Sequence, residues 1–508
     1  GSGSSDSLNI TGGGTALAAG DMSGVTGVET FLAVTNAALA VTTHDDNVVA
    51  GGTMTVNAAA LTTTVFTFTG SNETDGNFTV TTGGTGAHII ILGNGSDTYT
   101  STNTAGVNTV TATAGNNTIT TAAGADIITL GSGTDTVTTG AAADTINSTS
   151  ANLNLNDTIS AGAGTDILNM TDDSTVIDAD FTNVTAVETL TSDAAINLDA
   201  TLGTLAAAAG IVTVTFADTG ASDSLVLAAG MTNAVTVNLD TDAAAGNSVV
   251  ATNYTKTLTV AAAATDLDSA ASTITGGTGT ADELKVTGSA SLTVIVTTGV
   301  TLVEKITAVG TAGSFSLTTA DGLIASGKSL TVDTTAGDDD AFTINAAAEA
   351  DGTITINGDG SGAYIITLGA GADTYSNSTG TGIHTVTGTG GANSITTGTG
   401  ADIIIPGTGV DSLTGGTGAN IVTFTATTQM VANSVTISDY TTATYEIDFD
   451  ISATLSSGGT LIELSDASDA TAGDGGIEVI TGAFDLGTAD AGDIALIVNL
   501  TAGIASSR

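Results

Sequence analysis

Between positions 106 and 146, large apolar side chains recur at every ninth residue. They are Val110, Ile119, Ile128, Val137 and Ile146. Their immediate neighbours are mostly threonines, so apolar and polar residues alternate over each short stretch. This alternation predicts short β-strands whose aliphatic side chain points inward while the threonines point outward. The fixed nine-residue period predicts that the strands form a parallel β-solenoid.

The turns between these strands are rich in oxygen ligands and in glycine. An asparagine or aspartate precedes each aliphatic residue by two positions, at Asn108, Asn117, Asp126, Asp135 and Asp144. Small residues come before the aspartates, so the turns read Gly-x-Gly-x-Asp, with alanine at some glycine positions. Glycine permits a positive φ, which can turn backbone carbonyls toward a metal. Aspartate adds a carboxylate, and Ca²⁺ takes about six to eight oxygen ligands. These turns are therefore candidate calcium sites.

The same register returns in residues 369–422. Its members are His384, Asn393, Asp402, Asp411 and Asn420, again nine apart. Asp402 corresponds to Asp126, and Asp411 corresponds to Asp135, at the same offset (402 − 126 = 411 − 135 = 276). The offset also relates residues outside these turns, so we infer an internal duplication covering about 6–147 and 282–423.

The Gly-x-Gly-x-Asp-x-aliphatic turns resemble the RTX (repeat-in-toxin) family of secreted bacterial proteins. The resemblance implies a β-roll in which each nonapeptide is a turn plus a strand, and two nonapeptides make one coil. Residues 18 apart would then stack, with Asp126 beside Asp144 and Asn117 beside Asp135. It also implies that each Ca²⁺ lies between two stacked turns, bound by aspartate carboxylates and glycine carbonyls.

The predicted metal ligands are the aspartates and glycines of these turns. We call each of the two series of nonapeptide turns a ladder. In the first ladder the predicted ligands are Asp97, Gly124, Asp126, Gly131, Gly133, Asp135, Gly140, Asp144, Asp157, Gly162, Gly164 and Asp166. In the second they are Asp373, Gly398, Gly400, Asp402, Gly407, Gly409 and Asp411. Asp6 and Asp282 are weaker candidates, for which strand-end hydrogen bonding is the alternative. Asn108, Asn117, Asn393 and Asn420 lack the charge of aspartate, so calcium beside them is doubtful.

A second motif occurs three times, as an aspartate that is followed by a glutamate at a nearly constant distance. The pairs are Asp6 with Glu29, Asp166 with Glu188, and Asp282 with Glu304 (29 − 6 = 23; 188 − 166 = 304 − 282 = 22). The motif resembles modules of bacterial surface-layer (S-layer) proteins and giant adhesins. Alternating residues after each glutamate predict half-buried antiparallel strands.

We therefore predict an all-β, multidomain chain in which β-sandwich-like domains are interleaved with short parallel β-roll segments. The predicted segments are β-domain 1 (1–92), β-roll 1 (93–168), β-domain 2 (166–281), β-domain 3 (282–368), β-roll 2 (369–433), and a roll cap with a C-terminal β-domain (434–508).

Composition excludes several classes of partner and activity. The chain has 52 acidic and 5 basic residues among 508, for a net charge of −47, so it has no basic patch for nucleic acid. Apolar residues make up 41% of the chain, enough for a core, and cysteine is absent. No apolar run approaches the length of a membrane span. Zinc-protease and serine-hydrolase motifs are missing, and we predict that the chain is not an enzyme.

The resemblance implies a calcium-dependent structural protein, secreted by a type I system, that assembles with copies of itself into a lattice on the bacterial surface. Lipopolysaccharide or another envelope glycan is a candidate partner. The alternative is a repeat segment of a calcium-dependent adhesin or matrix fibre. Two remote alternatives remain: an ice-binding solenoid, suggested by Thr-x-Thr pairs such as Thr109/Thr111, and a β-helix polysaccharide lyase.

Overall fold

The computed structural model describes residues 6–11, 16–217, 222–239, 246–263, 266–267, 272–279, 281–287, 292–296, 299–309, 315–335, 341–358, 360–425, 429, 435–439, 445–449 and 499–500. The chain divides into two compact units. Unit 1 comprises residues 1–260 with 276–279, and unit 2 comprises residues 261–275 with 280–508.

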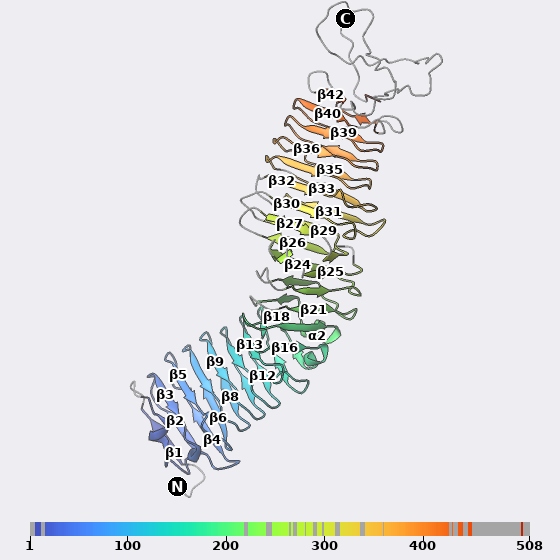
Figure 1. Cartoon of the computed structure of the whole chain (residues 1–508). Coiled ribbons are helices and arrows are strands. Elements are labelled where there is room, and N and C mark those ends of the chain that lie inside the picture. The colour runs from blue at the N-terminus through green and yellow to red at the C-terminus, as the bar shows by residue number, and fades with distance from the viewer. Residues whose placement is uncertain are drawn as a thin grey trace, which may run out of the picture. The chain divides into compact units, whose positions relative to one another are not determined.

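Unit 1 is a parallel β-solenoid, in which successive strands alternate between two faces (Figure 1). Face A contains β1 (Ser7–Ile10), β2 (Thr30–Ala33), β4 (Thr53–Asn57), β6 (Asn77–Thr82), β8 (Thr98–Ser101), β10 (Thr118–Thr120), β12 (Thr136–Thr138), β14 (Thr158–Ser160) and β17 (Val184–Thr185). Face B contains β3 (Leu39–Thr42), β5 (Phe66–Thr69), β7 (His88–Ile91), β9 (Asn108–Thr111), β11 (Ile127–Thr129), β13 (Thr145–Ser148), β15 (Ile167–Met170), β18 (Thr189–Ser192), β20 (Thr213–Thr215) and β22 (Val235–Asn238).

The later coils of unit 1 have a third face in addition to faces A and B. It contains β16 (Ser174–Val176), β19 (Leu198–Leu202), β21 (Ser224–Leu227) and β23 (Ser248–Val250). Short helices interrupt the loops: α1 (Ala19–Met22), η1 (Asp45–Asn47), η2 (Asp178–Phe181) and α2 (Thr204–Ala209). Strand β24 (Leu258–Ala263) follows β23 in the chain.

Unit 2 repeats the solenoid plan with two main faces. Face D contains β27 (Leu292–Val296), β30 (Phe315–Thr319), β32 (Phe342–Asn345), β34 (Tyr364–Thr367), β36 (Thr385–Thr387), β38 (Ile403–Ile405), β40 (Asn420–Phe424) and β42 (Tyr445–Phe449). Face E contains β26 (Glu283–Thr287), β29 (Lys305–Val309), β31 (Ser329–Asp333), β33 (Thr353–Asn357), β35 (Thr374–Ser376), β37 (Ser394–Thr396), β39 (Ser412–Thr414), β41 (Thr436–Ile437) and β43 (Asn499–Leu500). The short strands β25 (Thr273–Thr275) and β28 (Val300–Thr301) also pair.

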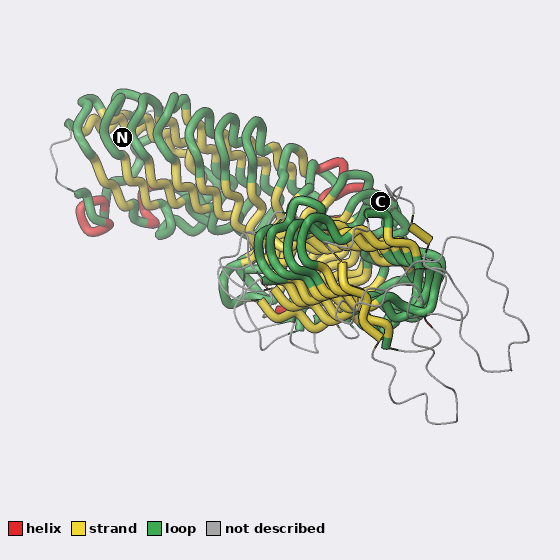
Figure 2. Tube along the Cα trace, turned by 90° about the horizontal axis from the view of Figure 1, so that it is seen from above, coloured by secondary structure: helices red, strands yellow, loops and turns green. Residues whose placement is uncertain are grey.

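Each coil contributes inward side chains to a narrow core that runs the length of its unit. Val110, Ile128 and Ile146 stack in successive coils and are 0% exposed. Burying one such side chain stabilises the fold by roughly 1.5–3 kcal/mol. Aromatic residues fill wider coils; Phe342 and Tyr364, for example, stack in neighbouring coils with ring centroids 4.9 Å apart. Figure 2 shows the strands of successive coils lying one on another, with loops between them.

The prediction of β-sandwich-like domains is wrong for the described residues. Strands in the predicted β-domains pair in parallel with strands one coil away, as β1 does with β2 and β26 with β29. The error has a physical reason: alternation shows that a strand has one buried face, but it does not say whether the neighbouring strand is parallel.

The strand positions reproduce the internal duplication. Strand β4 begins at Thr53 and β31 begins at Ser329, which is the offset found in the sequence (329 − 53 = 276). The six predicted segment boundaries stay predictions. Most of the predicted cap and C-terminal domain lies outside the described residues, which include only 435–439, 445–449 and 499–500 of that segment. No helix within the described part of the chain is long and apolar enough to cross a membrane.

Candidate metal sites between stacked turns

The side chains of the nonapeptide turns stack in adjacent coils. Asp126 precedes β11 and Asp144 precedes β13, and these strands pair with Ile128 opposite Ile146. Strands β10 and β12 pair with Ile119 opposite Val137, which brings Asn117 beside Asp135. The predicted stacking of residues 18 apart is therefore confirmed.

We call each series of stacked turn residues a column. Column 1 contains Asn108, Asp126, Asp144, Asp166 and Glu188, and column 2 contains Asp97, Asn117, Asp135 and Asp157. In unit 2, column 3 contains His384, Asp402 and Asn420, and column 4 contains Asp373, Asn393 and Asp411.

One hydrogen bond repeats along every column. A side-chain oxygen accepts the backbone N–H of the column residue one coil earlier. The N–H of Asp126 donates to Asp144 Oδ1 at 2.7 Å, and the N–H of Asp144 donates to Asp166 Oδ1 at 2.7 Å. In column 3 the N–H of His384 donates to Asp402 Oδ1 at 2.8 Å. A hydrogen bond to a charged group contributes about 1.5–3 kcal/mol, so this series stabilises the register of the coils.

The other carboxylate oxygen of most column aspartates is buried without a hydrogen-bond partner. These Oδ2 atoms belong to Asp97, Asp126, Asp135, Asp144, Asp166, Asp373, Asp402 and Asp411. The eight side chains are at most 1% exposed. Burying an ionised carboxylate oxygen without a partner costs several kcal/mol. The recurrence of this arrangement from turn to turn points to a cation as the missing partner.

The acidities of these groups reflect their burial. Burial raises the pKa of Asp144 to about 6; hydrogen bonds from Thr139 and Asp126 oppose the rise, and the carboxylates of Asp126 and Asp166 add to it. Burial likewise raises the pKa of Asp97 to about 6. The pKa also rises, with burial as the largest cause, at Asp126, Asp135, Asp157, Asp166, Asp373 and Asp411. A bound cation would favour the ionised form and reverse these shifts.

The glycines bring the turns of adjacent coils close together. Gly140 has a φ of 111°, and a Cβ on it would overlap the carbonyl oxygen of Ala122 in the preceding coil. A Cβ on Gly400 would likewise overlap the carbonyl oxygen of Gly382. Backbone carbonyls thus face the glycines of the next turn.

Four of the predicted ligand glycines use the positive φ that glycine permits: Gly124, Gly133, Gly140 and Gly162. The other six do not have a positive φ: Gly131, Gly164, Gly398, Gly400, Gly407 and Gly409. At five of these positions, all except Gly407, a Cβ would overlap backbone atoms of another turn. For example, a Cβ on Gly164 would overlap the carbonyl oxygen of Ala142.

Two of the column asparagines, Asn117 and Asn393, donate hydrogen bonds to turn oxygens without a metal. Asn117 Nδ2 donates to the carbonyl oxygens of Ala114 and Gly115 at 3.2 and 3.3 Å, and to Asp135 Oδ1 at 3.1 Å. Asn393 Nδ2 donates to the carbonyl oxygen of Gly390 at 2.9 Å. The amide N–H groups therefore occupy oxygens that a cation would need. This supports the interpretation that asparagine interrupts the metal ladder.

The two units differ in how many carboxylates are adjacent. Column 1 stacks Asp126, Asp144 and Asp166 directly on one another, and column 2 stacks Asp135 on Asp157. In column 3, Asp402 lies between His384 and Asn420, and in column 4 Asn393 separates Asp373 from Asp411. Burial lowers the pKa of His384, although the carboxylate of Asp402 opposes this. The nonapeptide turns of unit 2 therefore present single carboxylates, whereas those of unit 1 present adjacent ones.

Three predicted ligands differ from the rest. Both carboxylate oxygens of Asp157 accept backbone N–H groups, from Asp135 at 2.8 Å and from Asn154 at 2.9 Å. The N–H of Asp6 donates to Glu29 Oε2 at 2.8 Å, and that of Asp282 to Glu304 Oε2 at 3.0 Å. The Asp–Glu motif is therefore a coil-to-coil hydrogen bond in which glutamate replaces the column aspartate.

Sequence reasoning missed Asp223, which lies outside the four columns but has the same pattern of hydrogen bonds. This side chain is 1% exposed and accepts the N–H of Leu198 at 2.5 Å, while its own N–H donates to Asn247 Oδ1 at 3.1 Å. A signal was present, because Asp223-Ser-Leu225 repeats the Asp6-Ser-Leu8 sequence.

Comparison with protein families identifies the class of these turns. A family model described as the RTX calcium-binding nonapeptide repeat matches residues 102–137, 156–170, 378–413 and 387–422. The chain therefore carries RTX calcium-binding nonapeptide repeats within an all-β parallel solenoid. Neither the comparison with curated proteins nor the comparison with solved structures gives a match.

The residues of the columns fit Ca²⁺. Their donors are hard oxygens, from buried carboxylates and from the carbonyls of glycine-rich turns, as this ion prefers. Within the described nonapeptide turns, no three acidic side chains converge within 4.8 Å, so carbonyl oxygens and water would have to complete each coordination shell. Asp126, Asp144 and Asp166 would hold ions in column 1. Bound calcium would supply positive charge between carboxylates that otherwise repel one another.

Proposed function

We propose that this protein is a secreted, calcium-dependent structural protein that assembles on the bacterial cell surface as an S-layer subunit. The observation that carries the proposal is the series of buried column aspartates whose Oδ2 atoms lack a hydrogen-bond partner. Calcium binds the folded solenoid and not the unfolded chain, so binding draws folding with it. A chain exported unfolded from a calcium-poor cytoplasm would then fold outside the cell.

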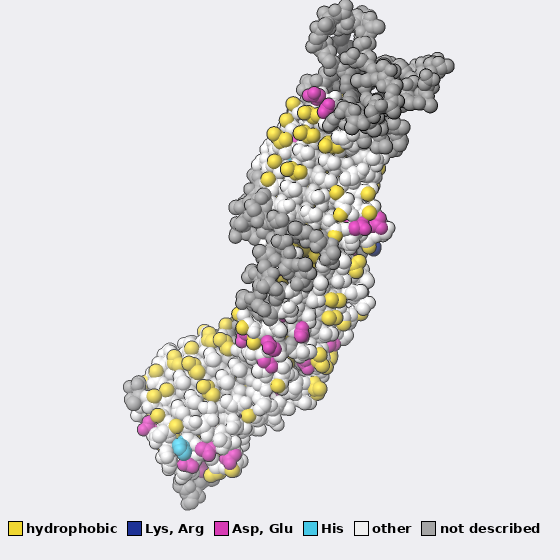
Figure 3. Space-filling view, in the orientation of Figure 1, with side chains coloured by type: hydrophobic (Ala, Val, Ile, Leu, Met, Phe, Trp, Pro, Cys, Tyr) yellow, Lys and Arg dark blue, Asp and Glu magenta, His cyan; other side chains and the backbone are white. Residues whose placement is uncertain are grey.

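The surface charge supports assembly through shared ions. The chain has 52 acidic and 5 basic residues, so copies have few salt bridges available to one another. Figure 3 shows acidic side chains on a surface made mostly of uncharged groups. Calcium bound between two acidic patches reduces their repulsion, which lets neighbouring copies approach. We also propose that the protein has no catalytic activity.

Electron microscopy of the purified protein with and without calcium tests the assembly. We expect two-dimensional sheets in millimolar calcium and dispersed particles after chelation with EGTA. Circular dichroism on the same samples separates folding from assembly. An unchanged β signal and melting temperature in EGTA would contradict the calcium dependence, whatever the particles look like.

The alternative is a repeat segment of a calcium-dependent adhesin or matrix fibre. The long internal duplication suits an array of tandem units. End-to-end chains in calcium, without sheets, would favour this alternative, as would binding to a cell-surface glycan. Lipopolysaccharide vesicles provide the direct test of an envelope partner.

A second candidate function rests on the threonines of face A. On face B the Thr-x-Thr pattern is interrupted, because Ile127 lies between Thr109 and Thr145. On face A one outward row is unbroken: Thr30, Thr55, Thr79, Thr98, Thr118, Thr136 and Thr158. A second row, two positions along each strand, contains Thr81, Thr100, Thr120 and Thr138. Neighbouring hydroxyls then repeat at about 4.8 Å across strands and about 6.8 Å along them.

Such a regular array of hydroxyls favours ice binding. Thermal hysteresis of the calcium-loaded protein is the test. Thr118→Lys on face A should abolish the activity, whereas Thr109→Lys on face B should retain it. Absence of hysteresis in the unmodified protein would exclude this function.

A further inference from the structure

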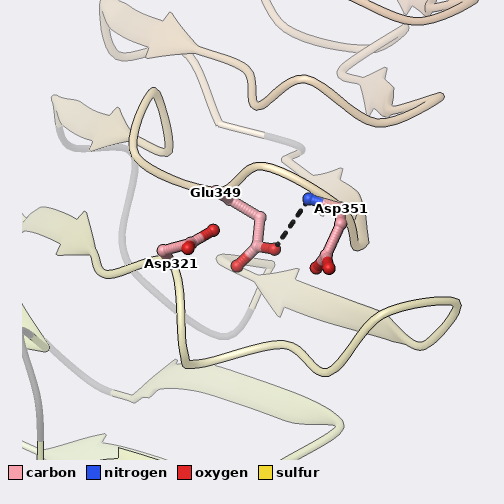
Figure 4. A group of neighbouring side chains, drawn as sticks. All are labelled: Asp321, Glu349 and Asp351. Carbon is pink, nitrogen blue, oxygen red and sulfur yellow. Dashed lines mark hydrogen bonds between the residues drawn. The ribbon is translucent and has the colours of Figure 1, made fainter.

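Three acidic side chains converge outside the nonapeptide turns, between two stacked turns of unit 2 (Figure 4). Asp321 lies in the turn after β30, and Glu349 and Asp351 lie in the turn after β32. Strands β30 and β32 pair in parallel, with Thr318 opposite Asn345, so the two turns are adjacent. One carboxylate oxygen from each residue lies within 4.8 Å of the others.

Glu349 has the environment of a ligand rather than of a surface acid. Its side chain is 1% exposed. Its Oε1 atom accepts the backbone N–H of Gly352 at 3.1 Å and that of Asp351 at 3.5 Å. Its Oε2 atom is buried with no hydrogen-bond partner, and the carboxylate lies between Asp321 and Asp351. Burial raises the pKa of Glu349, backbone hydrogen bonds from Gly352, Asp351 and Ile324 lower it, and the carboxylate of Asp321 raises it further.

We propose that Asp321, Glu349 and Asp351 bind a Ca²⁺ ion that joins the two adjacent turns. Glu349 Oε2 is the buried ligand, and the exposed carboxylates of Asp321 and Asp351 complete the acidic side of the site. Water reaches the ion from the exposed side and supplies the remaining oxygens that calcium takes. The site lies outside the residues matched by the nonapeptide family.

The first copy of the duplication provides a natural comparison. The equivalent residues are Asp45, Glu73 and Asp75 (321 − 45 = 349 − 73 = 351 − 75 = 276). Within the described residues, only the trio of the second copy converges within 4.8 Å. Glu73 shares the burial and the unpartnered Oε2 atom of Glu349, and the two copies differ at residue 74. Thr74 Oγ1 and its backbone N–H both donate to Asp45 Oδ1, at 2.8 and 3.0 Å, whereas Ala350 gives Asp321 only the backbone N–H, at 3.0 Å.

Counting calcium bound to the full chain tests the site. Equilibrium dialysis against ⁴⁵Ca²⁺ should show one ion fewer per chain for Glu349→Gln than for the unmodified protein. Ala350→Thr changes an exposed residue and should also lose one ion, because the new hydroxyl engages Asp321 as Thr74 engages Asp45. Glu73→Gln in the first copy is the matched control and should lose none. Equal counts for all four proteins would overturn the proposal, and equal losses from Glu349→Gln and Glu73→Gln would overturn its restriction to the second copy.

Melting temperatures distinguish a ligand from a hydrogen-bond acceptor. A glutamine keeps the Oε1 acceptor and removes a buried charge that Asp321 repels. Glu349→Gln should therefore melt higher than the unmodified protein in EGTA and lower in calcium. A shift of the same sign in both conditions would contradict metal binding at Glu349.

Asp126→Asn combined with Asp144→Asn separates this site from the proposed function. This double variant should lose nonapeptide ions and still show the one-ion difference caused by Glu349→Gln. If the nonapeptide turns bind no calcium, the one-ion difference at Glu349 should persist. If the difference disappears while the other ions remain, only the Glu349 site is wrong.

Discussion

Asp144 Oδ1 accepts the backbone N–H of Asp126 at 2.7 Å, although the two residues are 18 apart in the chain. The Oδ2 atom of the same carboxylate is buried and has no hydrogen-bond partner. One oxygen therefore connects two coils, and the other is available to a cation. A single side chain thus couples the stacking of the solenoid to its metal content, which is why calcium should control stability here.

The effect of Asp144→Asn on stability should have opposite signs without and with calcium. In calcium-stripped buffer at pH 7.5, the variant should be more stable by about 2 kcal/mol, because it removes a buried charge whose pKa is about 6 in the folded state. In calcium it should be less stable and bind fewer ions. Asn117 already shows that an amide at such a position can donate to turn carbonyls. Urea unfolding with and without calcium measures both effects.

Asp157→Asn is the control for that experiment. Both of its oxygens accept backbone N–H groups, so replacing one oxygen with an amide nitrogen loses a hydrogen bond under either condition. Burial also raises the pKa of Asp157, so removal of its charge offsets part of this loss. We expect stability to be unchanged or lower by up to about 1 kcal/mol, to the same extent with and without calcium. If Asp157→Asn also stabilised the calcium-free protein, simple charge reduction would explain both results.

Acidification should stabilise the protein when calcium is absent. Asp97 and Asp144 have folded-state pKa values of about 6 and ordinary values of 3.8, so the folded state binds protons more readily than the unfolded chain. Their stabilising contribution is complete below about pH 4 and is lost as pH rises through 6. Lowering the pH from 7 to 4 in metal-free buffer should therefore raise the melting temperature. In calcium it should fall over the same range, since protons displace the ion; a fall in both buffers would contradict this account.

Asn117→Asp should add a calcium ion to column 2. The substitution places a carboxylate directly between Asp97 and Asp135, where the asparagine now donates to Asp135 Oδ1. Without calcium the variant should lose about 2 kcal/mol, because a third charge joins two buried carboxylates. Dialysis should show at least one additional ion. Asn152→Asp, at a turn residue outside the columns, is the control and should leave the ion count unchanged.

The nonapeptide register could be predicted because its period is constant. Ile119 and Val137 are both buried, and they lie opposite each other in strands β10 and β12, as two nonapeptides per coil require. The other coils have unequal lengths. Thr30 pairs with Ser7 and with Thr55, and Thr79 pairs with Thr98, so the steps differ (30 − 7 = 23; 55 − 30 = 25; 98 − 79 = 19). Loop insertions are tolerated at little entropic cost, so the period drifts while the strands stay stacked. For this reason the first 92 residues have the pattern of a separate β-domain.

The metal site at Glu349 was not predictable for a different reason. Its ligands are widely spaced, since Glu349 and Asp351 both lie far beyond Asp321 (349 − 321 = 28; 351 − 321 = 30). The duplication repeats them as Asp45, Glu73 and Asp75, but that repeat does not show that the three side chains meet. Aspartates are also common in surface turns, so Asp321 and Asp351 have no distinctive sequence signal. Only the parallel pairing of β30 with β32 brings the two turns together.

Ala142→Gly should stabilise the first ladder. Ala142 occupies the second glycine position of its turn and has a φ of 96°, which a residue with a Cβ adopts at a cost of about 1–3 kcal/mol. Glycine removes that strain, so we expect a gain of about 1 kcal/mol with and without calcium. Ala163→Gly is the matched control: it is in the next turn of the column, lacks a positive φ, and should lose about 0.5–1 kcal/mol. A gain in both variants would show that flexibility rather than backbone strain is responsible.

The two ladders should lose calcium dependence separately. Asp126→Ala with Asp144→Ala removes two adjacent carboxylates from unit 1, whereas Asp402→Ala with Asp411→Ala removes two that lie in different columns of unit 2. The ladders belong to different compact units. In calcium, calorimetry of the first double variant should show one transition lowered, by at least about 2 kcal/mol of unfolding free energy, and the other nearly unchanged.

The second double variant should lose fewer ions, because Asp402 and Asp411 each lack an adjacent acidic partner in their columns. Equal loss in both transitions from either double variant would show that calcium stabilises the chain as one cooperative solenoid.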